Sequence, residues 1–383
     1  MSKPEKIKED MAWLRAENDS QHEQLEAFKE GITKHYRNKK WDRFKKHCND
    51  YELVFTSTPE YPSISAISPI SRSFFKLWET MQDYDELLDM GTERVNVAFL
   101  GEGPGGFVEA VCRRRAGIEG DRLFGMTLIS KNKNVPEWKL THRELYGKSF
   151  NVVVGADGTG DLYDVANIDV LVDKAGGSSL DLVTADGGFD FSGNFSCQEH
   201  LSTRLICAEI YAAILLSKVG GRFFLKVYDI RLVPTIVLLC VLAECYTDVL
   251  VTKPMSSRPA NSEKYLICTG FKGCDEGTLA MLRSCVSTGD LTILSKEESR
   301  ITRSFMRNLI RVNMYFIKRQ IGCIDKTLQC IQKYDVSTEH AKRSMVESLC
   351  KSQIAKSHAW CTQYGVGVSD AAMSKYELTT SLQ

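Results

Sequence analysis

Through the middle of the chain, two patterns of hydrophobic and polar positions alternate, one typical of strands and one typical of helices. Short apolar runs, each too brief for a helix, are separated by stretches whose apolar residues recur at helical intervals. The runs predict strands over residues 95–100, 122–128, 180–185, 222–227, 247–252 and 264–270. Strands that alternate with helices predict an α/β fold, a mostly parallel sheet with helices on both faces.

A glycine-rich turn, GEGPGG at residues 101–106, separates the first predicted strand from a helix over 107–115. Such a turn brings backbone N–H groups and a helix N-terminus close to a ligand at the carboxyl end of the strand. Its spacing differs from the G-x-G-x-x-G of dinucleotide folds, which disfavours a pyrophosphate. A nucleoside cofactor without phosphates remains, of which S-adenosylmethionine is the commonest, with an ordinary loop as the alternative.

Charged residues lie at the predicted strands. Asp186 directly follows the strand over 180–185, at the edge where α/β folds hold their ligands. A helix over 198–218, expected to end at Gly220 and Gly221, leads into the strand that carries Lys226. An unpaired buried ammonium is costly, so Lys226 lies at an edge, is paired or is functional. Asp161 is a candidate contact to an adenosine, or a plain turn residue.

The two ends of the chain differ from the middle. Residues 1–50 are highly charged and predict helix, with apolar residues at roughly helical intervals at Trp13, Leu14, Leu25, Phe28 and Ile32. Between Lys34 and Lys46, seven basic residues are interleaved with Tyr36, Trp41 and Phe44. This mixture suits a phosphate backbone with stacked bases, or equally a solvated helix face whose apolar residues turn inward. Residues 55–71 predict an irregular loop.

The last part, residues 276–383, predicts a basic helical appendage, because it holds 15 Lys and Arg against 10 Asp and Glu. The whole chain of 383 residues has a formal net charge of zero and 43% hydrophobic residues, enough for a sizeable core. No long uncharged apolar stretch and no signal peptide are evident, so we expect an intracellular protein of the nucleus or cytoplasm, without a membrane partner.

Thirteen cysteines occur without a C-x-x-C pair, which favours reduced, buried thiols. A metal site is not expected, because the separations among the Cys and His residues near the C-terminus fit no standard zinc spacing. Those residues are Cys323, Cys330, His340, Cys350, His358 and Cys361.

Four charged residues form a lysine–aspartate–lysine–glutamate set at strand-associated positions: Lys76, Asp186, Lys226 and Glu263. With this set the chain resembles the FtsJ-like RNA ribose 2′-O-methyltransferases, and SRSFFKL (71–77) looks like their first-lysine helix. It is most similar to the eukaryotic and viral mRNA cap 2′-O-methyltransferases. The segments that carry this resemblance are GEGPGGFVEAV (101–111), FGMTL (124–128), TADGGFDFSGN (184–194), GGRFFLKVYD (220–229) and KPMSSRPANSEKYLICTG (253–270).

The resemblance implies a Rossmann-like, S-adenosylmethionine-dependent methyltransferase fold. It implies a helical basic N-terminal extension and substrate loop (1–65), a methyltransferase domain (66–275) and a helical basic C-terminal appendage (276–383). The implied catalytic residues are Lys76, Asp186, Lys226 and Glu263. Lys226 is expected beside the 2′-hydroxyl, where it either accepts the hydroxyl proton or stabilises the developing alkoxide. The implied cofactor-binding residues are Glu102, Gly103, Pro104, Gly105, Gly106, Phe107, Asp161 and Asp186.

One position departs from the family pattern. Phe99 stands where the family commonly has an aspartate, five residues before the motif proline, and Glu102 is the expected replacement. The implied substrate is the 5′ end of capped mRNA, with capping or transcription machinery as partner. An rRNA or tRNA ribose methyltransferase and a non-catalytic RNA-binding subunit that retains the fold stay as alternatives.

Overall fold

The computed structural model describes residues 3–36, 39–84, 91, 93–132, 135–139, 150–189 and 197–378. The chain divides into two compact units, each built from separate stretches of sequence. Unit 1 comprises Met1–Met11, Ser73–Lys253 and Glu263–Leu309, and unit 2 comprises Ala12–Arg72, Pro254–Ser262 and Ile310–Gln383. The three-part division at residues 65 and 275 stays a prediction.

Unit 1 is organised around a seven-stranded sheet of order β3-β2-β1-β4-β5-β7-β6. The strands are β1 (Asn96–Leu100), β2 (Arg122–Met126), β3 (Phe150–Val152), β4 (Leu180–Ala185), β5 (Ser217–Val227), β6 (Tyr246–Thr252) and β7 (Lys264–Phe271). Strands β1 to β5 pair in parallel, whereas β7 is antiparallel to both β5 and β6. The expected mostly parallel sheet is therefore confirmed, with its antiparallel strand between β5 and β6.

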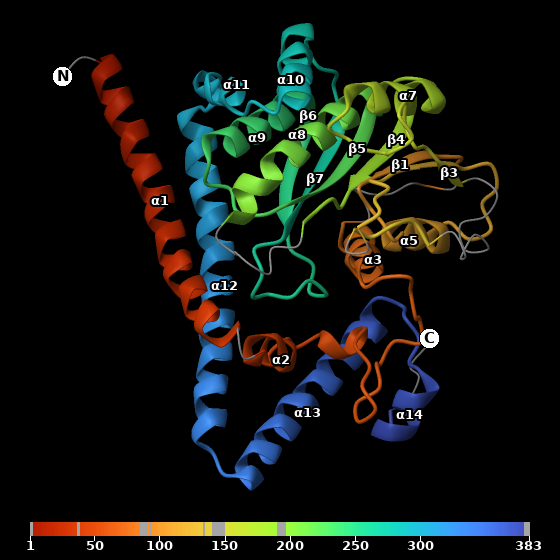
Figure 1. The fold of residues 1–383 in the computed structure, drawn as a ribbon, viewed down its shortest axis with the longest axis vertical. Coiled ribbons are helices and arrows are strands. Elements are labelled where there is room, and N and C mark those ends of the chain that lie inside the picture. Colours follow the sequence, from red (N-terminus) through yellow and green to blue (C-terminus); the bar gives the residue numbers. More distant parts are fainter. Residues whose placement is uncertain are drawn as a thin grey trace. The chain divides into compact units, whose positions relative to one another are not determined.

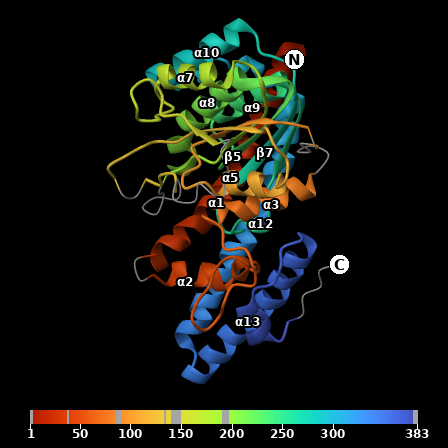
Figure 2. The same ribbon diagram turned by 90° about the vertical axis from the view of Figure 1, so that its right-hand side faces the viewer.

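Helices cover both faces of this sheet. Figures 1 and 2 show α3 (Ser73–Asp83) and α5 (Gly106–Arg114) on one face, and α7 (Val165–Ala175), α8 (Gln198–Leu216) and α9 (Val233–Cys245) on the other. Unit 1 also holds α10 (Glu276–Thr288), α11 (Thr292–Ser295) and the short η4 (Glu298–Arg300). Because both faces are covered, Val97 to Leu100 of β1 are completely buried. The Rossmann-like fold implied by the sequence is confirmed.

The sequence interpretation was wrong at the start of β5. Helix α8 ends at Leu216, and the strand begins at Ser217 and continues through Gly220 and Gly221, which were expected to terminate the helix. The register against β4 shifts here, because Leu180 pairs with Ser217 but Leu182 pairs with Arg222. The extra β5 residues form a bulge, and Gly220 supplies the positive φ of 79° that it requires.

Unit 2 is helical. Its elements are most of α1 (Lys3–Tyr36), α2 (Lys40–His47), the short η1 (Glu52–Val54), most of α12 (Arg303–Val336), α13 (Glu339–Gln363) and α14 (Asp370–Tyr376). Helices α1 and α12 pack in parallel, since Asn18 accepts a 2.8 Å hydrogen bond from Asn313 and Gly31 lies against Leu328 further along both helices. The predicted N- and C-terminal helical extensions are confirmed.

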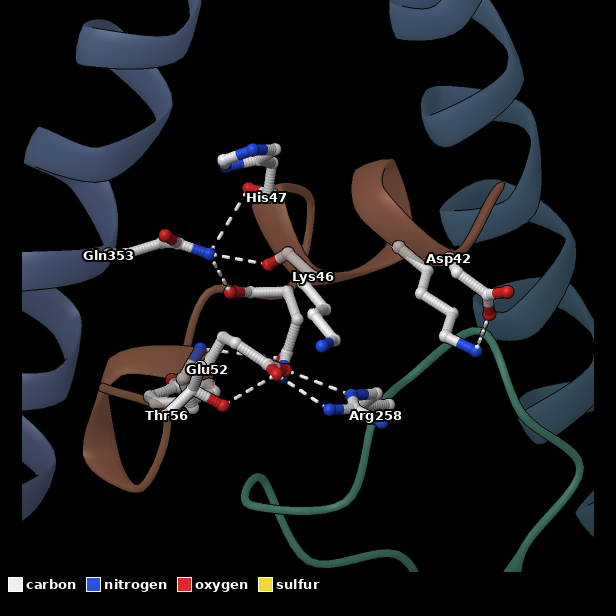
Figure 3. Close-up of polar contacts among 10 residues, drawn as sticks. Asp42, Lys46, His47, Glu52, Thr56, Arg258 and Gln353 are labelled. Atoms are coloured by element: carbon white, nitrogen blue, oxygen red, sulfur yellow. Dashed lines mark hydrogen bonds and ion pairs between the residues drawn. The ribbon is translucent and has the colours of Figure 1, made fainter. Parts of the chain in front are cut away.

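The C-terminal end of α2 is held by α13. The Gln353 side-chain amide donates hydrogen bonds of 2.7, 3.2 and 2.6 Å to the carbonyl oxygens of Lys46, His47 and Asn49 (Figure 3). The last carbonyls of a helix have no partner within the helix, so this side chain adds a donor to carbonyl oxygens at the end of α2 and just beyond it.

The basic stretch at 34–46 keeps Trp41 and Phe44 inside. Trp41 and Phe44 are 3% and 1% exposed, and the Arg43 guanidinium lies 5.1 Å from the centre of the Tyr334 ring. Trp41 and Phe44 are therefore unavailable for base stacking, and the structure favours the solvated helix face. Arg37 and the side chain of Tyr36 lie outside the described residues.

Candidate active site

Four charged side chains that are distant in the sequence come together in unit 1. Lys76 lies on α3, Asp186 follows β4, Lys226 is near the end of β5, and Glu263 directly precedes β7. The Lys76 Nζ atom lies 2.7 Å from Glu263 Oε1, and the Lys226 Nζ atom lies 3.2 Å from Asp186 Oδ1. Both lysines are at least nine-tenths buried, so two buried ion pairs form the centre of the candidate site.

Tyr265 joins the two ion pairs. Its hydroxyl donates a 2.8 Å hydrogen bond to Asp186 Oδ1 and accepts a 3.1 Å hydrogen bond from Lys76 Nζ. Its ring stacks on Phe224 with ring centres 4.7 Å apart. Sequence reasoning missed this residue, although side chains two positions apart on a strand share a face, which places Tyr265 on the side of Glu263.

The environment of Lys226 favours its ammonium form. Burial lowers the pKa of Lys226, but the attraction of nearby carboxylates, above all Asp186, outweighs burial and holds the pKa above its ordinary value. The ammonium also donates a 2.6 Å hydrogen bond to the backbone carbonyl oxygen of Asp186. Burial raises the pKa of neighbouring Tyr228 to about 12, so its phenol is neutral at pH 7.

The glycine-rich turn lies beside this cluster. Gly101 and Gly105 have φ of 62° and 117°, and Gly105 directly precedes the first residue of α5. A Cβ on Gly101 would lie 2.9 Å from the Cα of Gly187, the residue after Asp186. The turn and the Asp186 loop therefore touch through backbone atoms, which only glycine permits at this position.

The other residues of the turn face different surroundings. The Phe107 ring is buried 5.6 Å from the ring of Phe224, so it contributes to the core. Pro104 accepts a 3.2 Å hydrogen bond from the Lys139 N–H, and a Cβ on Gly103 would lie 2.1 Å from the carbonyl oxygen of Pro136. Residues 135–139 thus lie against the turn, a contact that the sequence did not predict. Gly106 is the first residue of α5.

Two carboxyl groups are buried beneath the turn. Glu102 Oε1 accepts a hydrogen bond from the Thr184 hydroxyl, and Glu209 Oε1, from α8, accepts a 3.1 Å hydrogen bond from the Gly187 N–H. Within the described part of the chain, the Oε2 atoms of both residues are buried without a hydrogen-bond partner. Burial raises the pKa of Glu102 well above its ordinary range and that of Glu209 to about 8.

Asp161 lies apart from the charged cluster. Its carboxylate accepts a 2.9 Å hydrogen bond from the Tyr163 N–H, in the loop between β3 and α7. That loop approaches the end of β2, since a Cβ on Gly160 would lie 2.1 Å from the carbonyl oxygen of Thr127. Three exposed apolar residues follow β2 and β3, namely Leu128, Ile129 and Val154. They form a surface beside Asp161 that sequence reasoning did not identify.

None of the His, Cys, Asp and Glu side chains in the described ranges gather in threes that could hold a metal ion. The thirteen cysteines form no disulfide. Eight are buried as predicted, whereas Cys112, Cys197, Cys274, Cys323 and Cys330 are partly exposed. No described helix combines the length and the apolar character needed to cross a bilayer.

Comparison with known proteins agrees with this fold. The model of the FtsJ-like methyltransferase family matches residues 69–271, more than half of the chain. The chain therefore belongs to the FtsJ-like methyltransferase family, and its cofactor is S-adenosylmethionine.

Two curated relatives carry the name cap-specific mRNA (nucleoside-2′-O-)-methyltransferase 1. The Trypanosoma brucei protein is 34% identical over 232 residues, which are 58% of this chain and 61% of that protein. The Caenorhabditis elegans protein is 34% identical over 191 residues, 49% of this chain but only 20% of that protein. A solved putative ribosomal RNA methyltransferase from Plasmodium falciparum is 19% identical, covers 53% of this chain and 98% of its own, and has a TM-score of 0.39.

The residues present suit a cationic cofactor of this kind. S-adenosylmethionine carries a positively charged sulfur and an ammonium group. Next to the glycine turn, Glu102 and Glu209 offer buried carboxyl oxygens that have no hydrogen-bond partner among the described residues. The exposed apolar residues near Asp161 suit the flat face of an adenine. The turn, Glu102 and Asp161 thus lie along the carboxyl ends of β1, β2 and β3, where α/β folds bind nucleosides.

Proposed function

We propose that this protein transfers the methyl group of S-adenosylmethionine to the ribose 2′-oxygen of a cap-proximal nucleotide in mRNA. The observation that carries the proposal is the hydrogen-bonded array of Lys76, Glu263, Tyr265, Asp186 and Lys226 beside the glycine turn. The names of the relatives support a capped RNA as substrate.

In this proposal Lys226 lies beside the 2′-hydroxyl. S-adenosylmethionine supplies an electrophilic methyl group on a positively charged sulfur. Because the surrounding carboxylates favour the ammonium form, Lys226 hydrogen-bonds to the hydroxyl oxygen and stabilises the negative charge that develops there. An ammonium cannot accept the hydroxyl proton, so that proton would leave to water as the oxygen–carbon bond forms and the methyl–sulfur bond breaks. Asp186 fixes the ammonium through its side chain and its carbonyl oxygen, so that the oxygen is aligned for attack.

The other residues of the array support the pair formed by Asp186 and Lys226. Lys76 is held by Glu263 and by the Tyr265 hydroxyl, and the same hydroxyl donates to Asp186. Lys76 also brings a second positive charge to the site, which suits the ribose-phosphate backbone of an RNA. The glycine turn with Glu102, and the loop with Asp161, are the proposed cofactor contacts.

The test is transfer of labelled methyl groups to capped and uncapped RNAs of one sequence, followed by mapping of the modified nucleotide. We expect labelling of the ribose in the first or second transcribed nucleotide of the capped RNA, and loss of labelling in Lys226→Ala. Equal labelling without a cap would contradict the cap proposal and indicate an rRNA or tRNA ribose methyltransferase. No effect of Lys226→Ala would indicate an RNA-binding subunit without catalysis.

The chain spans 61% of the length of the Trypanosoma brucei relative and a fifth of the length of the Caenorhabditis elegans relative. We propose that it acts inside the cell on newly capped transcripts, together with capping or transcription machinery. Co-purification with the guanylyl-transferring capping enzyme or with RNA polymerase would support this.

A further inference from the structure

One buried carboxyl group contacts the proposed catalytic residues without belonging to their array. Glu209 lies in the middle of α8, is 1% exposed, and reaches the loop that follows β4. Its Oε1 atom accepts the Gly187 N–H at 3.1 Å. On the other side of the same peptide unit, the Asp186 carbonyl oxygen accepts the Lys226 ammonium at 2.6 Å. The Asp186–Gly187 peptide therefore lies between a carboxyl group and the Lys226 ammonium.

The peptide bond makes this arrangement specific. Its C=O and N–H lie in one plane and point in opposite directions, so a group that fixes the N–H also fixes the direction of the carbonyl. A negative charge at the N–H end polarises the amide and makes its oxygen a stronger acceptor. Glu209 consequently acts on Lys226 without touching it.

Glycines make room for the Glu209 carboxyl group. A Cβ on Gly187 would lie 2.3 Å from Glu209 Oε1, and a Cβ on Gly101 would lie 3.4 Å from the same atom. The first glycine of the turn and the glycine after Asp186 thus leave a space that Oε1 occupies. Any larger residue at 187 would displace the carboxyl group from the peptide.

We propose that Glu209 is a positioning residue for methyl transfer, which holds the Asp186–Gly187 peptide so that its carbonyl oxygen orients the Lys226 ammonium toward the ribose hydroxyl. This inference rests on the proposed function of Lys226. Glu209 thereby has a role beyond packing, because it acts on the reaction through the peptide between Asp186 and Gly187.

The charged surroundings of Glu209 give the proposal a pH signature. Five titratable groups from four segments interact electrostatically with Glu209. They are Glu102, Tyr163, Asp186, Lys226 and Tyr228. Burial is the largest influence and raises the pKa of Glu209 to about 8, although Lys226 and the Gly187 N–H oppose it. The carboxyl group therefore ionises within a range that kinetics can cover.

The kinetic test compares kcat between pH 6.5 and 9.5 for the wild type, Glu209→Gln, Glu209→Leu and Glu199→Gln, with a short capped RNA and S-adenosylmethionine. Wild-type kcat should rise with pH through an inflection near 8, as ionised Glu209 strengthens the Asp186 carbonyl. Glu209→Gln keeps an accepting oxygen, so it should match the wild type within about threefold at pH 6.5 but lack the inflection. Glu209→Leu should be about 10- to 100-fold slower throughout.

Glu199→Gln is the matched control. Glu199 lies on the same helix and is also buried, but its Oε1 atom accepts the N–H groups of Arg231 and Leu232, both at 2.8 Å. This variant should keep the inflection. If Glu209→Gln retains the wild-type inflection, or if Glu199→Gln loses it, the proposed role of Glu209 is wrong.

A second measurement needs neither cofactor nor RNA. The sequence contains two Asp–Gly pairs, Asp157–Gly158 and Asp186–Gly187. In NMR spectra of the full chain labelled with ¹³C-carbonyl aspartate and ¹⁵N-glycine, only the amides of Gly158 and Gly187 show coupling between the two labels. The Gly187 signal should titrate near pH 8 in the wild type but not in Glu209→Gln, with Gly158 as internal reference. A Gly187 signal without this titration would overturn the inference.

The two tests separate this inference from the proposed function. Failure of the wild type to methylate capped RNA refutes the proposed function, and the Gly187 signal then still decides whether Glu209 controls the peptide. An active wild type combined with an unaltered Glu209→Gln profile refutes the inference alone.

Discussion

At the scale of single residues, the site depends on hydrogen bonds that connect charged groups. The Tyr265 hydroxyl is the group that both ion pairs share, because it contacts Asp186 and Lys76 at once. Burial, together with the nearby Asp186 and Glu263 carboxylates, raises the pKa of Tyr265 well above its ordinary range, so the hydroxyl remains a donor at any physiological pH.

Removal of this hydroxyl should disturb catalysis more than folding. Tyr265→Phe deletes both hydrogen bonds, and we expect a fall in kcat of about 10- to 100-fold with a loss of about 1–2 kcal/mol in unfolding free energy. Methyl-transfer kinetics and urea denaturation measure the two effects. Tyr246→Phe is the matched control, since this buried tyrosine contacts Ser217 at 3.3 Å, away from the charged cluster. A similar kcat loss in both variants would contradict the role assigned to Tyr265.

A second residue-scale prediction concerns pH and stability. Burial raises the pKa of Glu199 to about 7, above the value of roughly 4.3 for an unfolded glutamate. The folded state therefore holds a proton that the unfolded state has released, so the stabilisation is complete below pH ~4.3 and is lost as pH rises to about 7. Between these values the Tm of the wild type should fall relative to that of Glu199→Gln. A constant Tm difference across this range would contradict the shifted pKa.

Much of the site was predictable from residue types at given spacings. Asp186, Lys226 and Glu263 lie close together because the ends of β4, β5 and β7 meet at one edge of the sheet. Lys76 joins them from α3 through its ion pair with Glu263. Tyr265 and Glu209 were not found, because their importance lies in what their polar atoms face. The position of a residue along a strand or helix does not reveal which group its polar atom contacts in the folded protein.

At the scale of elements, backbone approach between the turn after β1 and the loop after β4 determines where the chemistry can occur. Gly101 has a φ of 62° and lies against Gly187, so both conformation and space require glycine there. The same reasoning explains why a sequence pattern could locate the turn. Glycines reveal close backbone contacts, whereas the bulge in β5 was misread because glycines also end helices.

Gly101→Ala should therefore be more harmful than alanine at another glycine of positive φ. The left-handed conformation alone costs about 1–2 kcal/mol, and the contact with Gly187 adds about 1–3 kcal/mol. Gly177→Ala is the control, because Gly177 has a φ of 75° and nothing within 4 Å of its added Cβ. Urea denaturation should show the larger loss for Gly101→Ala, and equal losses would refute the steric argument.

At the scale of the whole molecule, unit 2 contains the segment Pro254–Ser262, which precedes Glu263 in the chain. Within unit 2, the Arg258 guanidinium donates hydrogen bonds of 2.9 and 2.6 Å to the two carboxylate oxygens of Glu52, which also accept from Asn49 and Thr56 (Figure 3). Burial raises the pKa of Glu52, but Arg258 and the other donors outweigh burial and lower it.

Separation of this ion pair should destabilise unit 2. Arg258→Met leaves the Glu52 carboxylate, 2% exposed, without its charge partner, a change that costs about 3–5 kcal/mol in unfolding free energy. The double variant Glu52→Gln/Arg258→Met should recover most of the loss in a double-mutant cycle. Glu339→Gln, which removes one partner of the exposed pair with Lys342, should cost less than about 1 kcal/mol. Additive effects at Glu52 and Arg258 would show that the pair contributes little.

The parallel pairing of α1 with α12 has a consequence during synthesis of the chain. Asn18 leaves the ribosome 295 residues before Asn313, so α1 is synthesised well before α12, the helix against which it packs. At translation speeds of 5–20 residues per second that delay is roughly 15–60 s. During this interval Leu14, Leu25 and Ile32 are exposed to chaperones, and nascent chains truncated before α12 should be captured by them.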